Sequence, residues 1–177
     1  MSFVGIVRYV SRALALAVPL TLVIYALRRL VWRKKAADRG REWLVFLFIL
    51  YGTALIAITA IRDGAHLLDF WTQPHTTESI QLTPIFETLK QGRAGAWYLI
   101  YPVVGNIAWF VPLGFLLGRL RPAYGVWRMA LYSALVSVGI EILQWVLLSG
   151  ISDIDDVIFN VIGGIVGWGL SRLWKPG

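Results

Sequence analysis

Residues 152–170 read SDIDDVIFNVIGGIVGWGL, with three carboxylates at the start and no charge in the apolar run that follows. The pattern is typical of a helix that begins near Asp156. Carboxylates at a helix N-terminus are stabilised by free backbone amides and the helix dipole, by about 0.3–1 kcal/mol each. Ser152 or Asp153 is the expected N-cap. Capping accounts for one or two of the acids and leaves the third to be explained.

The composition predicts that the solvent of this chain is a lipid bilayer. Hydrophobic residues make up 58% of the 177 residues and charged residues only 15%, whereas a soluble domain has about 25% charged residues. Nine Trp and seven Tyr fit this interpretation, because amphipathic rings collect at membrane interfaces. The absence of cysteine excludes disulfides and thiolate metal sites. We expect an all-α membrane protein.

Five segments are long and apolar enough to cross a bilayer, each near the ~20 residues that span the hydrocarbon. They are residues 10–31, 43–61, 97–118, 125–148 and 156–173. All are predicted as helices, because an isolated strand cannot satisfy its backbone hydrogen bonds in lipid. We divide the chain into an N-terminal two-helix region, residues 1–75, and a second transmembrane domain, residues 76–173.

A short amphipathic helix is expected in the connection between the second and third spans. Apolar residues recur at helical spacing in QLTPIFETLKQG, with Thr83 as N-cap, Pro84 as the first helical residue and Gly92 as the stop. The helix either lies in the outer membrane interface or packs on the other spans.

The distribution of Lys and Arg predicts the orientation. Residues 28–42 contain seven basic and two acidic residues, and such loops stay in the cytoplasm. Alternation of five helices then puts the N-terminus outside and the C-terminus in the cytoplasm, although Arg8 and Arg12 oppose this. The net charge of +7 lies in loops beside apolar runs, so we read it as a topology signal and expect no nucleic-acid partner.

Polar side chains occur inside three successive spans. Asn106 lies about 13 Å along its helix from Trp97. Glu141 and Gln144 continue a stripe of two serines, Ser133 and Ser137, on one face of the fourth span. A carboxylate there costs a few kcal/mol unless it is paired, hydrated or protonated, so Glu141 is expected to face the protein interior.

The fifth span repeats this pattern. Asp156 and Asn160 share a helical face with the glycines that follow, and that face is suited to close helix packing. Small residues at Gly114/Gly118 and at Gly163/Gly167 also offer surfaces for another copy of the chain.

These polar residues are expected to form one cluster that opens outward and binds a ligand. The candidate binding residues are Asn106, Glu141, Gln144, Asp153, Asp155, Asp156 and Asn160. Glu141 is the best catalytic candidate, and Asp153, Asp155 and Asp156 are candidate ligands of a divalent metal, although no cofactor is expected. The alternative is a hydrogen-bonded network that only holds the helices together.

Three blocks of sequence resemble the VanZ-like family of bacterial membrane proteins. The first is N-x-x-x-F-x-P-x-G from Asn106 to Gly114, and the second is S-x-x-x-E-x-x-Q from Ser137 to Gln144. The third is D-I-D-D-x-x-x-N-x-x-G-x-x-x-G, from position 153 to position 167. Many members have an Arg three residues before the first Asp, where this chain has Gly150.

The resemblance implies a cell-envelope role in the bacterial plasma membrane, since members of the family are associated with resistance to teicoplanin-type lipoglycopeptide antibiotics. Our leading hypothesis is a protein, not assigned as an enzyme, whose polar pocket binds a membrane lipid or a lipoglycopeptide-like, cell-wall-related amphiphile. One alternative is a membrane enzyme with Glu141 as general base and a metal on the aspartates. Another is a small transporter coupled to ions or protons.

Overall fold

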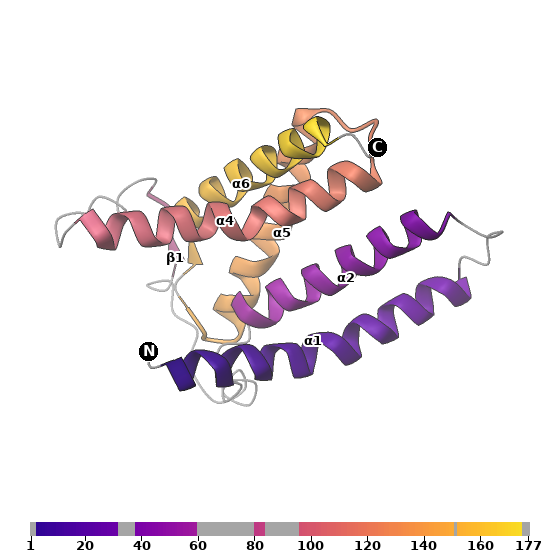
Figure 1. Cartoon of the computed structure of the whole chain (residues 1–177). Helices are drawn as coiled ribbons and strands as arrows, with labels where there is room; N and C mark the ends of the chain where they lie inside the picture. The colour runs from indigo at the N-terminus through magenta and orange to yellow at the C-terminus, as the bar shows by residue number, and fades with distance from the viewer. Residues whose placement is uncertain (1–2, 32–37, 60–79, 84–95, 151, 175–177) are drawn as a thin grey trace.

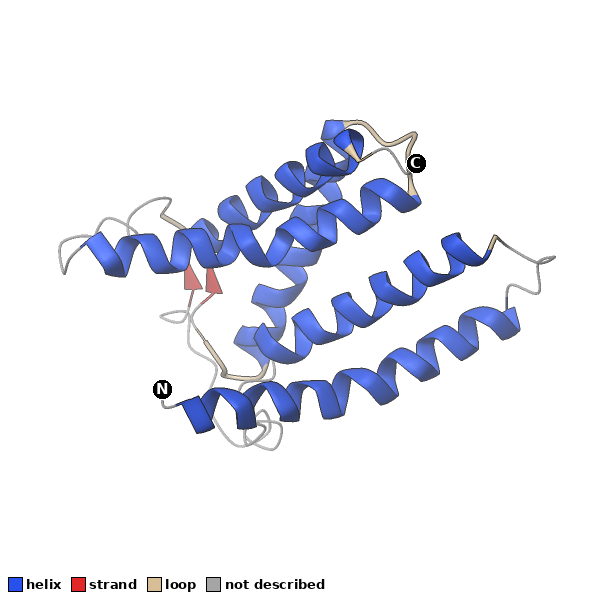
Figure 2. Ribbon diagram, viewed as in Figure 1, coloured by secondary structure: helices blue, strands red, loops and turns tan. Residues whose placement is uncertain are grey.

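The computed structural model describes residues 3–31, 38–59, 80–83, 96–150 and 152–174. Within these residues the chain forms five long helices and two very short strands (Figures 1 and 2). The helices are α1 (Phe3–Val31), α2 (Arg39–Thr59), α4 (Ala96–Leu120), α5 (Val126–Val146) and α6 (Ile154–Leu173). All five are long and apolar enough to cross a membrane, which confirms the predicted fold class. The predicted short amphipathic helix, which would begin at Pro84, lies outside the described residues.

Successive helices run in alternating directions, so the two termini lie at opposite ends of the bundle (Figure 1). We call the end where α5 stops and α6 starts the acidic end, because it carries Asp153, Asp155 and Asp156. We call the opposite end the basic end. Its described arginines are Arg28, Arg29, Arg39, Arg41, Arg119, Arg121, Arg128 and Arg172.

Helices α4 and α6 form the most extensive helix–helix contact in the described structure. Their backbones touch, because a Cβ atom on Gly167 would collide with the carbonyl oxygen of Val111, and one on Gly114 with that of Gly164. Small residues allow this approach in membranes, where dispersion contacts between helices replace the hydrophobic effect. The glycine pairs considered above for contact with another copy therefore face each other within one chain.

Helix α1 packs against α2 through small residues and a buried hydroxyl pair. Ala13, Ala17 and Ala57 form a small core between the two helices. One turn further along, Thr21 and Thr53 share a hydrogen bond of 2.7 Å between their hydroxyls. Thr21 is fully buried, so the two hydroxyls give each other a hydrogen-bond partner that lipid could not provide.

An apolar core joins α2 to the other helices. It consists of Leu55 from α2, Phe110 and Leu113 from α4, and Ile140 from α5. Beside this core, the Tyr51 hydroxyl of α2 donates a 2.6 Å hydrogen bond to the carbonyl oxygen of Trp109. The α1–α2 pair is therefore attached to the rest of the bundle through α2.

The two short strands tie the acidic end together. β1 (Ile80–Gln81) pairs in parallel with β2 (Ser152–Asp153), with Ile80 opposite Ser152. β2 leads directly into α6. The connection before α4 is thus hydrogen-bonded to the residues that start α6 (Figure 2).

A left-handed residue ends α5. Leu148 has φ of 51°, and the Ser149 amide donates a 2.9 Å hydrogen bond to the Gln144 carbonyl oxygen while the Leu148 amide bonds to that of Trp145. This is the Schellman arrangement, in which glycine is the usual left-handed residue. Leucine at this position strains the turn that leads to β2.

Candidate functional site

The acids at the start of α6 divide between a cap and the first helical turn. Asp153 is the N-cap, and its Oδ1 accepts a 2.9 Å hydrogen bond from the Asp155 amide. Asp155 and Asp156 follow in the first turn. The predicted cap at Asp153 is confirmed, and the helix starts at Ile154, the residue that follows this cap.

Glu141 of α5 holds the segment that precedes α6. Its Oε2 atom accepts a 3.0 Å hydrogen bond from the Asp153 amide, and its backbone carbonyl accepts one of 2.8 Å from the Ser152 hydroxyl. Glu141 is only 7% exposed, as expected for a carboxylate that must avoid lipid. The cap of α6 and the carboxylate of α5 are therefore one connected unit.

Asp156 contacts α4 from the first turn of α6. The Asn106 side-chain amide donates a 2.5 Å hydrogen bond to Oδ1 of Asp156. The contact places Asn106 level with the start of α6, so about three turns of α4 extend beyond it, as Figure 1 shows. The distance of Asn106 from Trp97 therefore does not measure its depth relative to α6.

Asn160 forms the next polar layer, one turn further along α6. Its Nδ2 donates a 2.9 Å hydrogen bond to the Ser137 hydroxyl of α5. Both residues are buried, with exposed fractions of 5% for Asn160 and 0% for Ser137. The other amide atom, Oδ1, has no hydrogen-bond partner among the described residues. An unsatisfied buried acceptor costs about 1–3 kcal/mol, so a hydrogen-bond donor that reached this atom would be stabilised there.

The remaining two candidates occupy different positions. Gln144 extends toward α2, where its Nε2 donates a 3.1 Å hydrogen bond to the Thr59 carbonyl oxygen. It therefore satisfies a carbonyl at the C-terminal end of α2. Asp155 is 2% exposed and takes part in the cap through its backbone amide. Asp155 thus contributes to the cap of α6. The residues that connect the three helices are Asn106, Ser137, Glu141, Asp156 and Asn160.

Metal binding by the three aspartates stays a prediction. Within the described segments, no three His, Asp or Glu side chains gather in a way that could hold a metal ion. The Asp153 side chain caps α6, and the Asp156 side chain accepts a hydrogen bond from Asn106. Both histidines, His66 and His75, lie outside the described residues.

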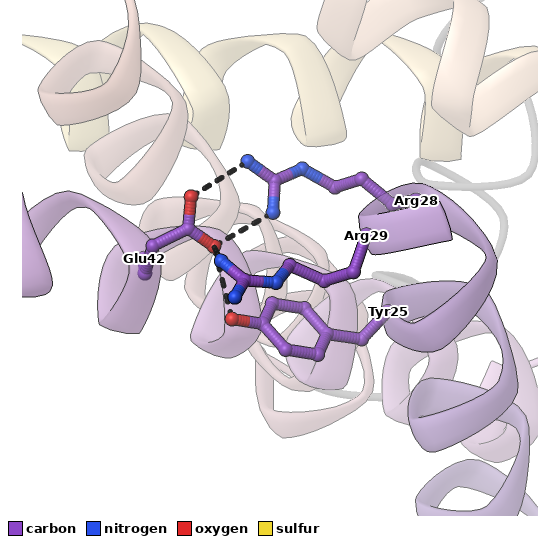
Figure 3. Close-up of polar contacts among 4 residues, drawn as sticks. All are labelled: Tyr25, Arg28, Arg29 and Glu42. Carbon is purple, nitrogen blue, oxygen red and sulfur yellow. Dashed lines mark hydrogen bonds and ion pairs between the residues drawn. The ribbon is translucent and has the colours of Figure 1, made fainter. Parts of the chain in front are cut away.

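Sequence reasoning missed a second polar centre, at the basic end. The Glu42 carboxylate of α2 accepts two hydrogen bonds from Arg28 and one from Tyr25, both on α1 (Figure 3). The signal in the sequence was a lone glutamate in a basic loop. Its partner Arg28 lies on a different helix, so the pairing depends on how α1 packs against α2 and not on helical spacing.

The fold and the hydrogen-bond network among α4, α5 and α6 define a class: a multi-pass helical membrane protein with buried polar contacts between its helices. A family model described as VanZ/LLP1 matches residues 46–175. A relative from Enterococcus faecium, Protein VanZ, is 33% identical over 129 residues, which cover 71% of this chain and 73% of that protein. The chain belongs to the VanZ/LLP1 family. The match begins within α2 and includes every candidate site residue. No solved structure matches.

Proposed function

We propose that this protein acts in the cell envelope by binding the polar headgroup of an amphiphile at Asn106, Glu141, Asp156 and Asn160. The amphiphile is a lipid or a lipoglycopeptide-like molecule. The unpartnered Oδ1 of Asn160 carries this proposal, because a network that only held helices together would be expected to satisfy its buried acceptors. A ligand hydroxyl or ammonium group is a suitable donor for that oxygen.

The surroundings support an amphiphile over a wholly polar ligand. On α5, Val138 and Ile142 are exposed within one helical turn of Glu141, and on α6 Ile158 and Ile162 are exposed on the face opposite Asn160. In a bilayer these side chains face acyl chains. A bound amphiphile would keep its tail along Val138 and Ile142 while its headgroup contacted the polar residues between the helices.

The orientation belongs to the same proposal. The excess of arginine at one end favours the cytoplasm for that end, which puts the acidic end in the outer half of the membrane. Amphiphiles that arrive from outside, including lipoglycopeptide antibiotics, would meet the site from that side. Tolerance of such antibiotics is the physiological outcome we propose, consistent with kinship to Protein VanZ.

Native mass spectrometry of gently extracted protein tests the binding step. We compare the wild type with Asn160→Leu, which removes the unpartnered oxygen and keeps the branching of the side chain at Cγ, and with Ser171→Ala. Ser171 is buried on the same helix at the basic end. We expect a co-purified lipid or added lipoglycopeptide to remain on the wild type and on Ser171→Ala and to be lost from Asn160→Leu. If all three folded proteins retained the ligand equally, Asn160 would have no role in binding, and the polar residues would only hold the helices together.

A further inference from the structure

The basic end contains a cation cluster that the proposed function does not use. We define this basic cluster as Arg28 and Arg29 in the last turn of α1 with Arg39 and Arg41 at the start of α2. Figure 3 shows Arg28 and Arg29 directed, with Tyr25, at the single carboxylate of Glu42. One acid therefore serves two guanidinium groups.

The two arginines share Glu42 unequally. Arg28 donates two hydrogen bonds, of 2.8 and 3.0 Å, one to each carboxylate oxygen. The Tyr25 hydroxyl adds a third of 2.9 Å. Arg29 comes only within 3.7 Å of Oε2 and its side chain is 58% exposed. Because the carboxylate is already occupied, Arg29 keeps donors that no hydrogen bond among the described residues uses.

The start of α2 adds positive charge at the same place. Arg39 and Arg41 are exposed in its first turn, where the positive end of the helix dipole makes cations unfavourable and anions favourable. Asp38 compensates in part, since its Oδ1 accepts a hydrogen bond from the Gly40 amide. The basic cluster retains an excess of positive charge after Asp38 and Glu42 are counted.

The position of the basic cluster identifies the kind of anion. α1 ends at Val31 and α2 starts at Arg39, and both are candidate membrane spans. Their shared end therefore lies at the level of lipid headgroups. Trp43, one residue beyond Glu42, is 65% exposed, as expected for an interfacial ring. A guanidinium fork matches two oxygens of a phosphate.

We propose that Arg29, supported by Arg39 and Arg41, binds the phosphate of an anionic phospholipid, with the Arg28–Glu42 pair holding α1 and α2 in position around it. Arg28 satisfies Glu42, which leaves Arg29 available for the lipid. This site is at the other end of the bundle from the amphiphile site and is independent of it.

Titration of the full-length protein in detergent, followed by native mass spectrometry, tests the proposal. The probes are phosphatidylglycerol and, as a zwitterionic reference, phosphatidylcholine. Arg29→Gln should weaken phosphatidylglycerol binding by about fivefold, as expected for one cation at a membrane surface, and leave phosphatidylcholine unchanged. Arg121→Gln is the matched control, because Arg121 is exposed at the same end but outside the basic cluster. It should behave as the wild type.

A second variant separates lipid binding from a structural role. Glu42→Gln removes the competing carboxylate charge, and its amide oxygen can still accept a hydrogen bond from Arg28, so it should strengthen phosphatidylglycerol binding while α1 and α2 stay in contact. Weaker binding in this variant would overturn the proposal, as would equal losses in Arg29→Gln and Arg121→Gln. Displacement of the lipid by excess inorganic phosphate would assign the site to a free ion and overturn the lipid as its occupant.

Discussion

Asn106 on α4 and Asp156 on α6 are joined by a 2.5 Å hydrogen bond between side chains 50 residues apart in sequence. The bond depends on an acceptor at position 156, and a charged acceptor makes it stronger. We predict that Asp156→Asn leaves the protein folded but reduces its envelope activity. The measurement is antibiotic tolerance in cells that express the variant, with its amount in the membrane determined in parallel.

Asp153→Asn is the matched control for that experiment. Asp153 caps α6, and Asn caps a helix about as well as Asp. This variant should keep its activity and its melting temperature, whereas Asp153→Ala should lose about 1 kcal/mol of stability. If the two Asp→Asn variants lost activity to the same degree, the division between cap and binding residue would be wrong.

Glu141→Gln should spare membrane insertion and abolish amphiphile binding. The Gln side-chain oxygen can still accept the hydrogen bond that the Asp153 amide now gives to Oε2, so the connection to α6 survives. What disappears is the carboxylate charge. A carboxylate buried without a cationic partner costs stability, so the melting temperature should stay the same or rise. Full binding by this variant in native mass spectrometry would restrict Glu141 to a structural role.

Glycine packing between α4 and α6 predicts a contrast between two positions on one helix. Gly167→Ala would drive a methyl group into the Val111 carbonyl, and the backbone must move, at a cost of about 1–3 kcal/mol. Gly169→Ala meets nothing within 4 Å and should be neutral or stabilising by up to about 1 kcal/mol. Thermal unfolding in detergent measures both. Similar melting temperatures would argue against backbone contact at this interface.

The strained turn after α5 predicts that position 148 is more stable with glycine than with alanine. Leu148→Gly should be more stable than Leu148→Ala by about 1 kcal/mol, because only glycine adopts positive φ without a steric penalty. The comparison cancels the loss of the leucine side chain, which both variants share. Denaturant unfolding of the two variants decides it, and a more stable alanine variant would contradict the left-handed assignment.

Cysteine labelling tests the orientation, and the chain has no native cysteine to interfere. Ala123 is exposed between α4 and α5 at the basic end, and Leu82 is 72% exposed beside β1 at the acidic end. With a membrane-impermeant reagent on intact cells, Leu82→Cys should react and Ala123→Cys should react only after lysis. The reverse result would place the acidic end in the cytoplasm.

The helices could be predicted from composition because length and hydropathy are local properties. The predicted spans and the observed helices agree within a few residues for α2, α4, α5 and α6. α1 starts at Phe3, seven residues before the predicted span. The first two turns of α1 contain Arg8, whose low hydropathy argues against a membrane span. A helix end that lies in water nevertheless accepts an exposed arginine.

The pairings within the site were only partly accessible from sequence. Helical spacing puts Ser137 and Glu141 on one face of α5, and their burial confirms that face. It does not say which turn of α6 meets which turn of α5. That register depends on close contacts such as the one between Gly164 of α6 and the side chain of Ser133 on α5. For the same reason, the contact of Gln144 with Thr59 could not be read from its place beside Glu141.

The contact between α4 and α6 has a mechanical consequence. Where backbone meets backbone at Gly114, Gly163 and Gly167, there are no side chains whose rotamers could change to let one helix slide past the other. The two helices are therefore expected to move as a single rigid plate about 30 Å long. Any rearrangement on ligand binding must then occur along the borders of the plate with α5 or with the α1–α2 pair, where side chains provide the contacts. Asp156 and Arg172 lie in the first and last turns of α6, so a displacement of Asp156 would move Arg172 by a similar amount.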